Sequence, residues 1–240
     1  MQLLPDVFLI SGYAYGLHPN VYAVKGDGAV VLIDSGLDEK DLAMIDENRR
    51  AWNLGQLPIT HVLFTHAHFD HSGNARALHQ RGARTVAGLG DAEGIELGDD
   101  RTIPYAYGRT FPTCPIDLKV KEGDTVRTAG LEFQVIHVPG HSKGCVFYRL
   151  VRSGRVILFT GDVVQVGQDC ESATLGWTGG VDYDRAAYMQ TLTRVARLEC
   201  DVVLAGHYQP CLKDGFRILQ HAYLRALLEW RQMAAPVSIG

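Results

Sequence analysis

The segment from Thr65 to His71 places three histidines and one aspartate within a few residues. It reads Thr-His-Ala-His-Phe-Asp-His. Imidazole and carboxylate groups are the ligands that hold zinc or iron at ~2 Å. His66 and His68 are two residues apart, so they point to the same side of an extended segment, and Asp70 and His71 can face a second position as the chain turns. This spacing indicates a metal site.

Three further polar residues follow apolar segments later in the chain. They are His141 in Pro-Gly-His, Asp162 in Gly-Asp and His207 in Gly-His. Each is preceded by glycine, which lets the backbone turn sharply so that the next side chain faces the site. Each comes after an expected strand: Leu131–His137, Val156–Thr160 and Val202–Ala205. The repeated context indicates that these side chains complete the site.

In this order, the His-x-His-x-Asp-His motif, the Pro-Gly-His turn, the Gly-Asp turn and the Gly-His turn resemble the metallo-β-lactamase superfamily. The resemblance covers essentially the whole chain and implies the αββα fold. It implies that one metal is held by His66, His68 and His141, a second by Asp70, His71 and His207, and that Asp162 bridges the two. Asp34 resembles the family's buried aspartate, which orients a ligand histidine through its other ring nitrogen.

The elements that must position these residues repeat in two halves. The first half contains apolar, β-branched strands, then a helix and a buried strand; a short helix opens at Ser72-Gly73-Asn74 and runs to about Gln80. The second half repeats strands followed by helices. Two such halves stack as a four-layer αββα sandwich of two mixed β-sheets flanked by helices, in one domain over residues 1–240. The remaining expected strands are Val7–Ser11, Val21–Lys25, Ala29–Ile33, Ile59–Thr65 and Val146–Val151, and the long helices are Asp38–Trp52, Arg185–Leu198 and Phe216–Met233.

A site of this kind predicts a hydrolase. Two divalent metal ions, zinc first with iron or manganese as alternatives, lower the pKa of bound water to ~7. The expected reaction is attack by a metal-activated hydroxide on the carbonyl of a small ester, lactone or thioester. Asp70 and Asp162 are the expected catalytic carboxylates, and Asp70 would take the proton and return it to the leaving group.

The substrate is less sharply indicated. Residues 208–240 are expected to form about one helix, which disfavours a glyoxalase II-like glutathione site. Lactonase-like members commonly carry a tyrosine three residues after the bridging aspartate, where this chain has Gln165. True β-lactamases of the family usually lack the bridging aspartate. Two long segments, 99–115 and 166–184, are expected to wall the pocket, whose candidate residues are Tyr105, Tyr107, Lys143, Gln165, Trp177 and Tyr208.

Composition restricts the partners. The net charge of -4 disfavours a nucleic-acid binder with a broad basic face, and no apolar run approaches ~18 residues. The N-terminal segment has no basic region, so no signal peptide is expected, and five cysteines without a C-x-x-C pair favour a cytoplasmic protein. A small-molecule substrate and a possible homodimer are expected.

Two alternatives compete with hydrolysis. One is a mononuclear iron dioxygenase of a sulfur compound, which resembles another branch of the same superfamily and uses only the first metal position. The other is a non-catalytic metal-binding or regulatory protein that keeps the fold.

Overall fold

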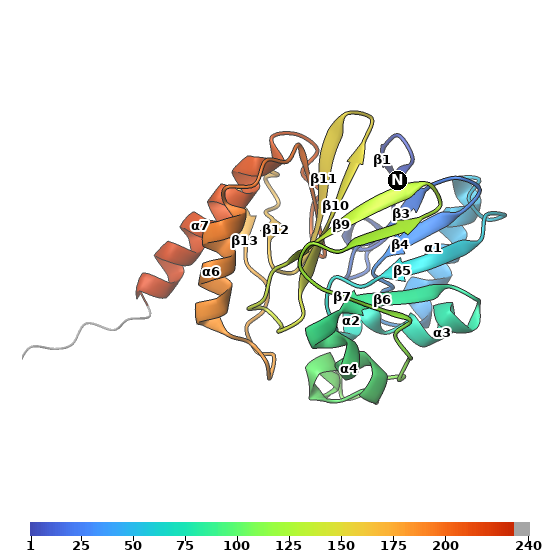
Figure 1. Cartoon of the computed structure of the whole chain (residues 1–240), viewed down its shortest axis with the longest axis horizontal. Coiled ribbons are helices and arrows are strands. Elements are labelled where there is room, and N and C mark those ends of the chain that lie inside the picture. Colours follow the sequence, from blue (N-terminus) through green and yellow to red (C-terminus); the bar gives the residue numbers. More distant parts are fainter. Residues whose placement is uncertain (233–240) are drawn as a thin grey trace, which may run out of the picture.

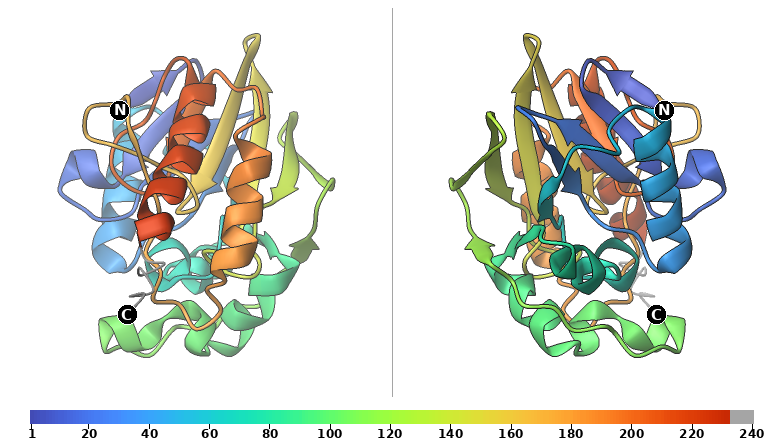
Figure 2. Two further views of the ribbon diagram at one scale, coloured as in Figure 1. Left: turned by 90° about the vertical axis from the view of Figure 1, so that its left-hand side faces the viewer. Right: turned by 90° about the vertical axis from the view of Figure 1, so that its right-hand side faces the viewer.

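The computed structural model describes residues 1–232. Two β-sheets pack face to face, and helices cover both outer faces (Figure 1). The side views show α6 and α7 over one outer face and α1 over the other (Figure 2). The expected αββα sandwich is confirmed.

The first sheet follows the order of the chain. Its first four strands pair antiparallel, and β4 to β7 pair parallel, so the sheet is mixed. The strands are β1 (Gln2–Leu4), β2 (Val7–Ser11), β3 (Val21–Lys25), β4 (Val30–Ile33), β5 (Ile59–Leu63), β6 (Arg84–Gly88) and β7 (Leu118–Val120).

The second sheet has the order β14-β11-β10-β9-β8. Only β11 and β14 pair parallel, and the other neighbours are antiparallel. Its strands are β8 (Thr125–Thr128), β9 (Leu131–His137), β10 (Val146–Arg152), β11 (Arg155–Gly161) and β14 (Val202–Ala205). A separate small hairpin pairs β12 (Gln165–Val166) with β13 (Ala173–Thr174) at the start of the expected wall segment 166–184.

The helices begin and end where the sequence supplies caps. Asp38 precedes α1 and its side chain accepts a hydrogen bond from the backbone N–H of Lys40 at 3.0 Å. Asp184 does the same for α6 with two backbone N–H groups. Carboxylates at these positions satisfy N–H groups that have no partner within the helix. The helices are α1 (Glu39–Ala51), α2 (Phe69–Ser72), α3 (Ala75–Gln80), α4 (Leu89–Leu97), α5 (Pro104–Tyr107), α6 (Arg185–Val195) and α7 (Gly215–Gln232), with 3₁₀ turns at Tyr13–Tyr15 and Asp100–Thr102.

Several expected boundaries need correction. Asp70 and His71 lie on the short helix α2, ahead of the helix expected to open at Ser72. The expected helix Arg185–Leu198 ends at Val195. The expected end of the last helix, Met233, lies outside the described residues.

Three groups of buried apolar side chains separate the four layers. The central group lies between the sheets and includes Phe133 and Phe159. A second group, which includes Ile45, lies under α1, α3 and α4, and a third, which includes Tyr188 and Leu219, lies under α6 and α7. Each fully buried side chain of this size contributes roughly 1.5–3 kcal/mol relative to exposure. The sheets are therefore held in one alignment, and so are the turns at their ends.

All five cysteines are unpaired. Within residues 1–232, no helix is both long enough and apolar enough to cross a bilayer.

Candidate metal centre

The candidate centre lies where strands of both sheets end. β4 and β5 pair parallel and deliver Asp34 and the histidine motif; β11 and β14 pair parallel and deliver Asp162 and His207. β9 runs in the same direction as β11, because both pair antiparallel with β10, and His141 follows it. Strands that run in one direction end at one edge, so residues distant in the sequence meet there.

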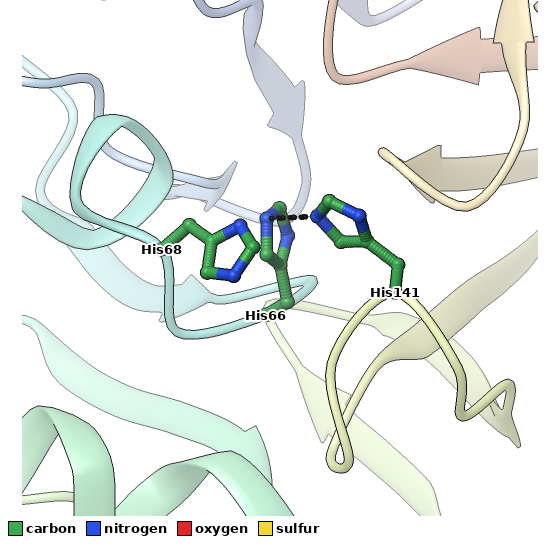
Figure 3. A group of neighbouring side chains, drawn as sticks. All are labelled: His66, His68 and His141. Carbon is green, nitrogen blue, oxygen red and sulfur yellow. Dashed lines mark hydrogen bonds between the residues drawn. The ribbon is translucent and has the colours of Figure 1, made fainter. Parts of the chain in front are cut away.

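The first cluster consists of His66, His68 and His141, whose imidazoles converge from two turns (Figure 3). All three are buried. The Nε2 atoms of His66 and His141 lie 3.2 Å apart. The Nε2 atom of His68 is buried without a hydrogen-bond partner within the described residues.

The ring protons of this cluster can be assigned from its partners. Nδ1 of His141 lies 2.9 Å from the carbonyl oxygen of Trp177, which can only accept. Nδ1 of His66 lies 3.1 Å from Oγ1 of Thr65, whose own hydrogen is directed to Asp34. Both Nδ1 atoms therefore donate, and two Nε2 lone pairs face each other at 3.2 Å. Such an arrangement fits a cation between the rings.

The second cluster consists of Asp70, His71 and His207. Nε2 of His207 lies 3.2 Å from Nε2 of His71 and 3.2 Å from Oδ2 of Asp70. The Nδ1 atoms again face acceptors. For His71 the acceptor is Oδ2 of Asp34 at 2.9 Å, and for His207 it is the carbonyl oxygen of His18 at 3.1 Å.

Asp162 lies between the two clusters. Its Oδ1 is 3.3 Å from Nε2 of His71, and its Oδ2 is 3.3 Å from Nε2 of His207 and 3.9 Å from Nε2 of His141. One carboxylate thus reaches both clusters. The seven side chains that the sequence singled out as metal ligands are all brought together.

The two clusters differ in how they hold protons. Burial lowers the pKa of His66 and His141, and it lowers that of His68 to about 3, so these rings are neutral. Burial also opposes charge on His207, but the carboxylates of Asp162 and Asp70 outweigh it and raise the pKa of His207 to about 10. A cation that enters the second cluster therefore displaces protons.

The glycines before the ligands serve two different purposes. Gly140 has a φ of 136°, a conformation that favours glycine, and a Cβ there would lie 2.3 Å from the Cα of Tyr188. The sharp-turn explanation fails for Gly206, whose φ is not positive. There a Cβ would lie 2.5 Å from Oδ1 of Asp162 and 2.6 Å from Cε1 of His71. Gly206 leaves space for the ligands.

Comparison with known families agrees with this geometry. Residues 14–207 match the family model described as the metallo-beta-lactamase superfamily. The chain belongs to this superfamily. As a member with hydrolase relatives, it is a metal-binding hydrolase.

The superfamily relatives include two named hydrolases and one solved β-lactamase. The human acyl-coenzyme A thioesterase MBLAC2 is 28% identical, over 82% of this chain and 75% of that protein. A hydroxyacylglutathione hydrolase of Cereibacter sphaeroides is 30% identical, over 68% of this chain and 51% of that protein. BJP-1, a subclass B3 metallo-beta-lactamase of Bradyrhizobium japonicum, has a TM-score of 0.76 and 25% identity, covering 98% of this chain and 93% of that one.

A cavity of about 530 Å³ opens beside the clusters. Its lining includes four of the pocket residues expected from the sequence, namely Tyr107, Gln165, Trp177 and Tyr208. Tyr105 and Lys143 are not in the lining. The hydroxyl of Tyr105 donates to the carbonyl oxygen of Gly179 at 3.0 Å. The backbone N–H of Lys143 donates to Asp182, and the residue is exposed.

Sequence reasoning missed three residues that support the centre. His18 lines the cavity, and its carbonyl oxygen faces His207. Asn20 donates through Nδ2 to the carbonyl oxygens of Ala205 and Tyr208, at 3.0 and 3.1 Å, and so holds the turn that carries His207. Asp91 joins the turns of the first cluster. Each residue acts on a segment far away in the sequence, so local patterns carry no signal for it.

Proposed function

We propose that the protein is a dinuclear, zinc-dependent hydrolase of a small ester, lactone or thioester. His66, His68 and His141 would hold one ion, and Asp70, His71 and His207 the other, with Asp162 between them. The observation that carries this proposal is the pair of facing Nε2 atoms, one pair in each cluster, both at 3.2 Å. Imidazole and carboxylate donors in this number suit zinc.

Bound divalent ions would supply hydroxide at neutral pH and polarise the acyl oxygen. The chain's own groups then orient the substrate and move the proton. Asp70 lines the cavity, and although burial opposes its charge, His71 and His207 hold its pKa well below the usual range. It is therefore ionised at neutral pH, and its carboxylate can accept a proton and return it to the leaving group.

The cavity favours a small acyl compound with an apolar part. Its lining includes the apolar side chains of Ile103, Ala106, Leu175 and Trp177. No lysine or arginine contributes to the lining formed by residues 1–232. A phosphate or carboxylate on the leaving group therefore has no lysine or arginine side chain to bind it in this lining. The relatives' names support hydrolysis of acyl compounds, and one of them specifies a thioesterase.

The metal content of the purified protein tests this proposal. We expect about two zinc ions per chain, and hydrolysis of small thioesters, lactones or esters in a substrate panel. Asp162→Ala should lose at least ~100-fold in kcat/KM, because even residues behind a metal ligand typically contribute 10–100-fold. Asp201→Ala is the matched control, since Asp201 caps the opposite end of the same strand pair by accepting from the N–H of Val156 at 2.8 Å.

The other outcomes identify the competing functions. One iron per chain without zinc would favour the dioxygenase of a sulfur compound. Metal binding without turnover of any panel substrate would favour a regulatory protein. The assembly of the second cluster supports the dinuclear hydrolase over both.

A further inference from the structure

Asp91 is a fully buried carboxylate outside the two clusters. It lies in the first turn of α4, where the N-terminal end of a helix favours negative charge. No ion pair involves it among the described residues. Burial raises the pKa of Asp91 to about 6, and the charge of Asp182 adds to that effect. A buried carboxylate without a cation is costly unless hydrogen bonds compensate it.

Three hydrogen bonds compensate Asp91, and they come from two turns. Oδ2 accepts from the backbone N–H of Ala67 at 2.8 Å and from Oγ of Ser142 at 2.6 Å. Oδ1 accepts from the backbone N–H of Gly144 at 2.6 Å. The single carboxylate thus joins a segment after β5 to a segment after β9.

These donors are neighbours of the first cluster. Ala67 stands between His66 and His68, and Ser142 directly follows His141. One side chain thus accepts hydrogen bonds from both turns. The carboxylate does not itself belong to either cluster.

The backbones around Asp91 pack without spare room. A Cβ at Gly144 would lie 2.2 Å from the backbone nitrogen of Asp91 and 2.5 Å from its Oδ1. A Cβ at Gly90 would lie 2.9 Å from the Cα of Gly144. The two turns and the start of α4 therefore pack in direct contact, with the Asp91 carboxylate between the turns and a backbone hydrogen bond from Val146 to Thr65 at 2.9 Å beside it.

We infer that Asp91 is a positioning residue that holds the turn of His66 and His68 against the turn of His141, and so sets the spacing of the first metal position. This inference rests on the proposed metal centre. Asp91 would thus change the zinc affinity although it contacts neither the metal position nor the substrate cavity. Loss of Asp91 should weaken one zinc position and leave the other nearly unchanged.

Zinc affinity measured by competition with a chromogenic chelator tests the inference. For Asp91→Asn we expect a 10–100-fold weaker first position, the range typical of residues that orient metal ligands. The amide offers one acceptor oxygen where the carboxylate offers two. At limiting zinc the variant should hold about one ion per chain, and excess zinc should restore kcat.

A milder variant and a matched control keep the test independent of folding. Ser142→Ala removes one of the three hydrogen bonds to Asp91, together with the contact of the Ser142 hydroxyl with Sγ of Cys145 at 3.0 Å, and should weaken the same position by less than Asp91→Asn. Asp117→Asn is the control, because Asp117 accepts from the N–H and hydroxyl of Thr85 at 2.8 and 3.1 Å, away from both clusters. It should lose stability without losing zinc.

The outcomes separate this inference from the proposed function. If the unmodified protein binds no zinc, the proposed function fails and the inference with it. If the unmodified protein binds two zinc ions, and Asp91→Asn binds both with affinities within twofold of those of the unmodified protein, the inference alone is overturned. Loss of zinc in Asp117→Asn equal to that in Asp91→Asn would also overturn it.

Discussion

Replacement of Asp34 by asparagine should weaken one metal position without removing a ligand. Oδ1 of Asp34 accepts from the backbone N–H of Thr65 at 2.8 Å, and Oδ2 accepts from Oγ1 of Thr65 at 2.9 Å and from Nδ1 of His71 at 2.9 Å. Asparagine has one acceptor oxygen in place of two. When that oxygen accepts from the backbone N–H of Thr65, the NH2 group faces the N–H of His71, so two donors meet in a buried place.

The size of the effect follows from that lost acceptor. A hydrogen bond to a charged group contributes ~1.5–3 kcal/mol, so the metal-free variant should be less stable by about that amount. Without that acceptor, nothing holds the Nδ1 side of the His71 ring in the orientation that turns Nε2 toward Asp162 and His207. We therefore expect a ~10–100-fold loss of zinc affinity at the second position.

The backbone conformation at position 34 is compatible with asparagine. Asp34 has a φ of 60°, and asparagine tolerates that region better than most residues. Zinc affinity is measured by chelator competition, and stability by urea unfolding of the metal-free protein. Asp41→Asn is the control, because Asp41 is a buried carboxylate that accepts from Ser11 and Leu37, both at 2.9 Å, and contacts no ligand. Wild-type affinity at both positions in Asp34→Asn would refute the reasoning.

Three further predictions concern other parts of the site. Gly206→Ala places a methyl group 2.5 Å from Oδ1 of Asp162. We expect overpacking to lower the free energy of unfolding by ~1–3 kcal/mol and to weaken zinc binding. Unchanged urea unfolding and zinc titration would contradict this prediction. Trp177→Ala keeps the backbone carbonyl that faces His141 but removes an apolar side chain from the cavity lining. Steady-state kinetics should show KM raised ~10-fold, as expected for ~1.4 kcal/mol of lost burial, and the zinc content should be unchanged. A fall in kcat alone would count against this prediction. The pKa of Asp91 is raised by burial to about 6, so its contribution to stability is fully present below its unfolded pKa of ~3.9 and is lost as pH rises through 6. The difference in unfolding free energy between the metal-free wild type and Asp91→Asn should therefore grow by about 2–3 kcal/mol from pH 7 to pH 4, and a difference that is constant with pH would show that Asp91 does not titrate in this range.

The sequence predicts the parts of the fold that carry strong periodic signals. Val7–Ser11, Val21–Lys25, Leu131–His137 and Val202–Ala205 are strands with the expected bounds. These segments are apolar and β-branched, and they are buried as the pattern requires. Helix α1 lies one residue inside each end of the expected range, and its start was predictable because Asp38 caps it and acidic residues fill its first turn.

Helix α4 could not be predicted from its own residues. It contains Gly90 and Gly94, and its terminal residues Leu89 and Leu97 are exposed. Apolar side chains therefore do not line one face, and helical periodicity is absent. Only Ala92 and Ile95 bury apolar side chains in the core, and Gly90 and Gly94 allow close approach to Gly144 and Arg101. Because α4 was missed, the position of Asp91 was missed as well.

The candidate ligands were predictable because their chemistry is local. Three histidines and an aspartate occur within one short segment, and each remaining ligand follows a strand and a glycine. The residues that orient them are not local. Asn20 lies 185 residues from its partner Ala205, and His18 lies 189 residues from His207. Only the packing of the two sheets brings such pairs together.

The seven side chains of the centre come from both sheets, and this has a consequence for how the protein fails under stress. A small slip of one sheet along the other leaves most strands paired but separates the imidazoles of one half from the carboxylate of the other. Catalysis is therefore a more sensitive gauge of inter-sheet alignment than circular dichroism. During denaturation, turnover should vanish at lower urea than the far-ultraviolet signal, and added zinc should draw the two midpoints together.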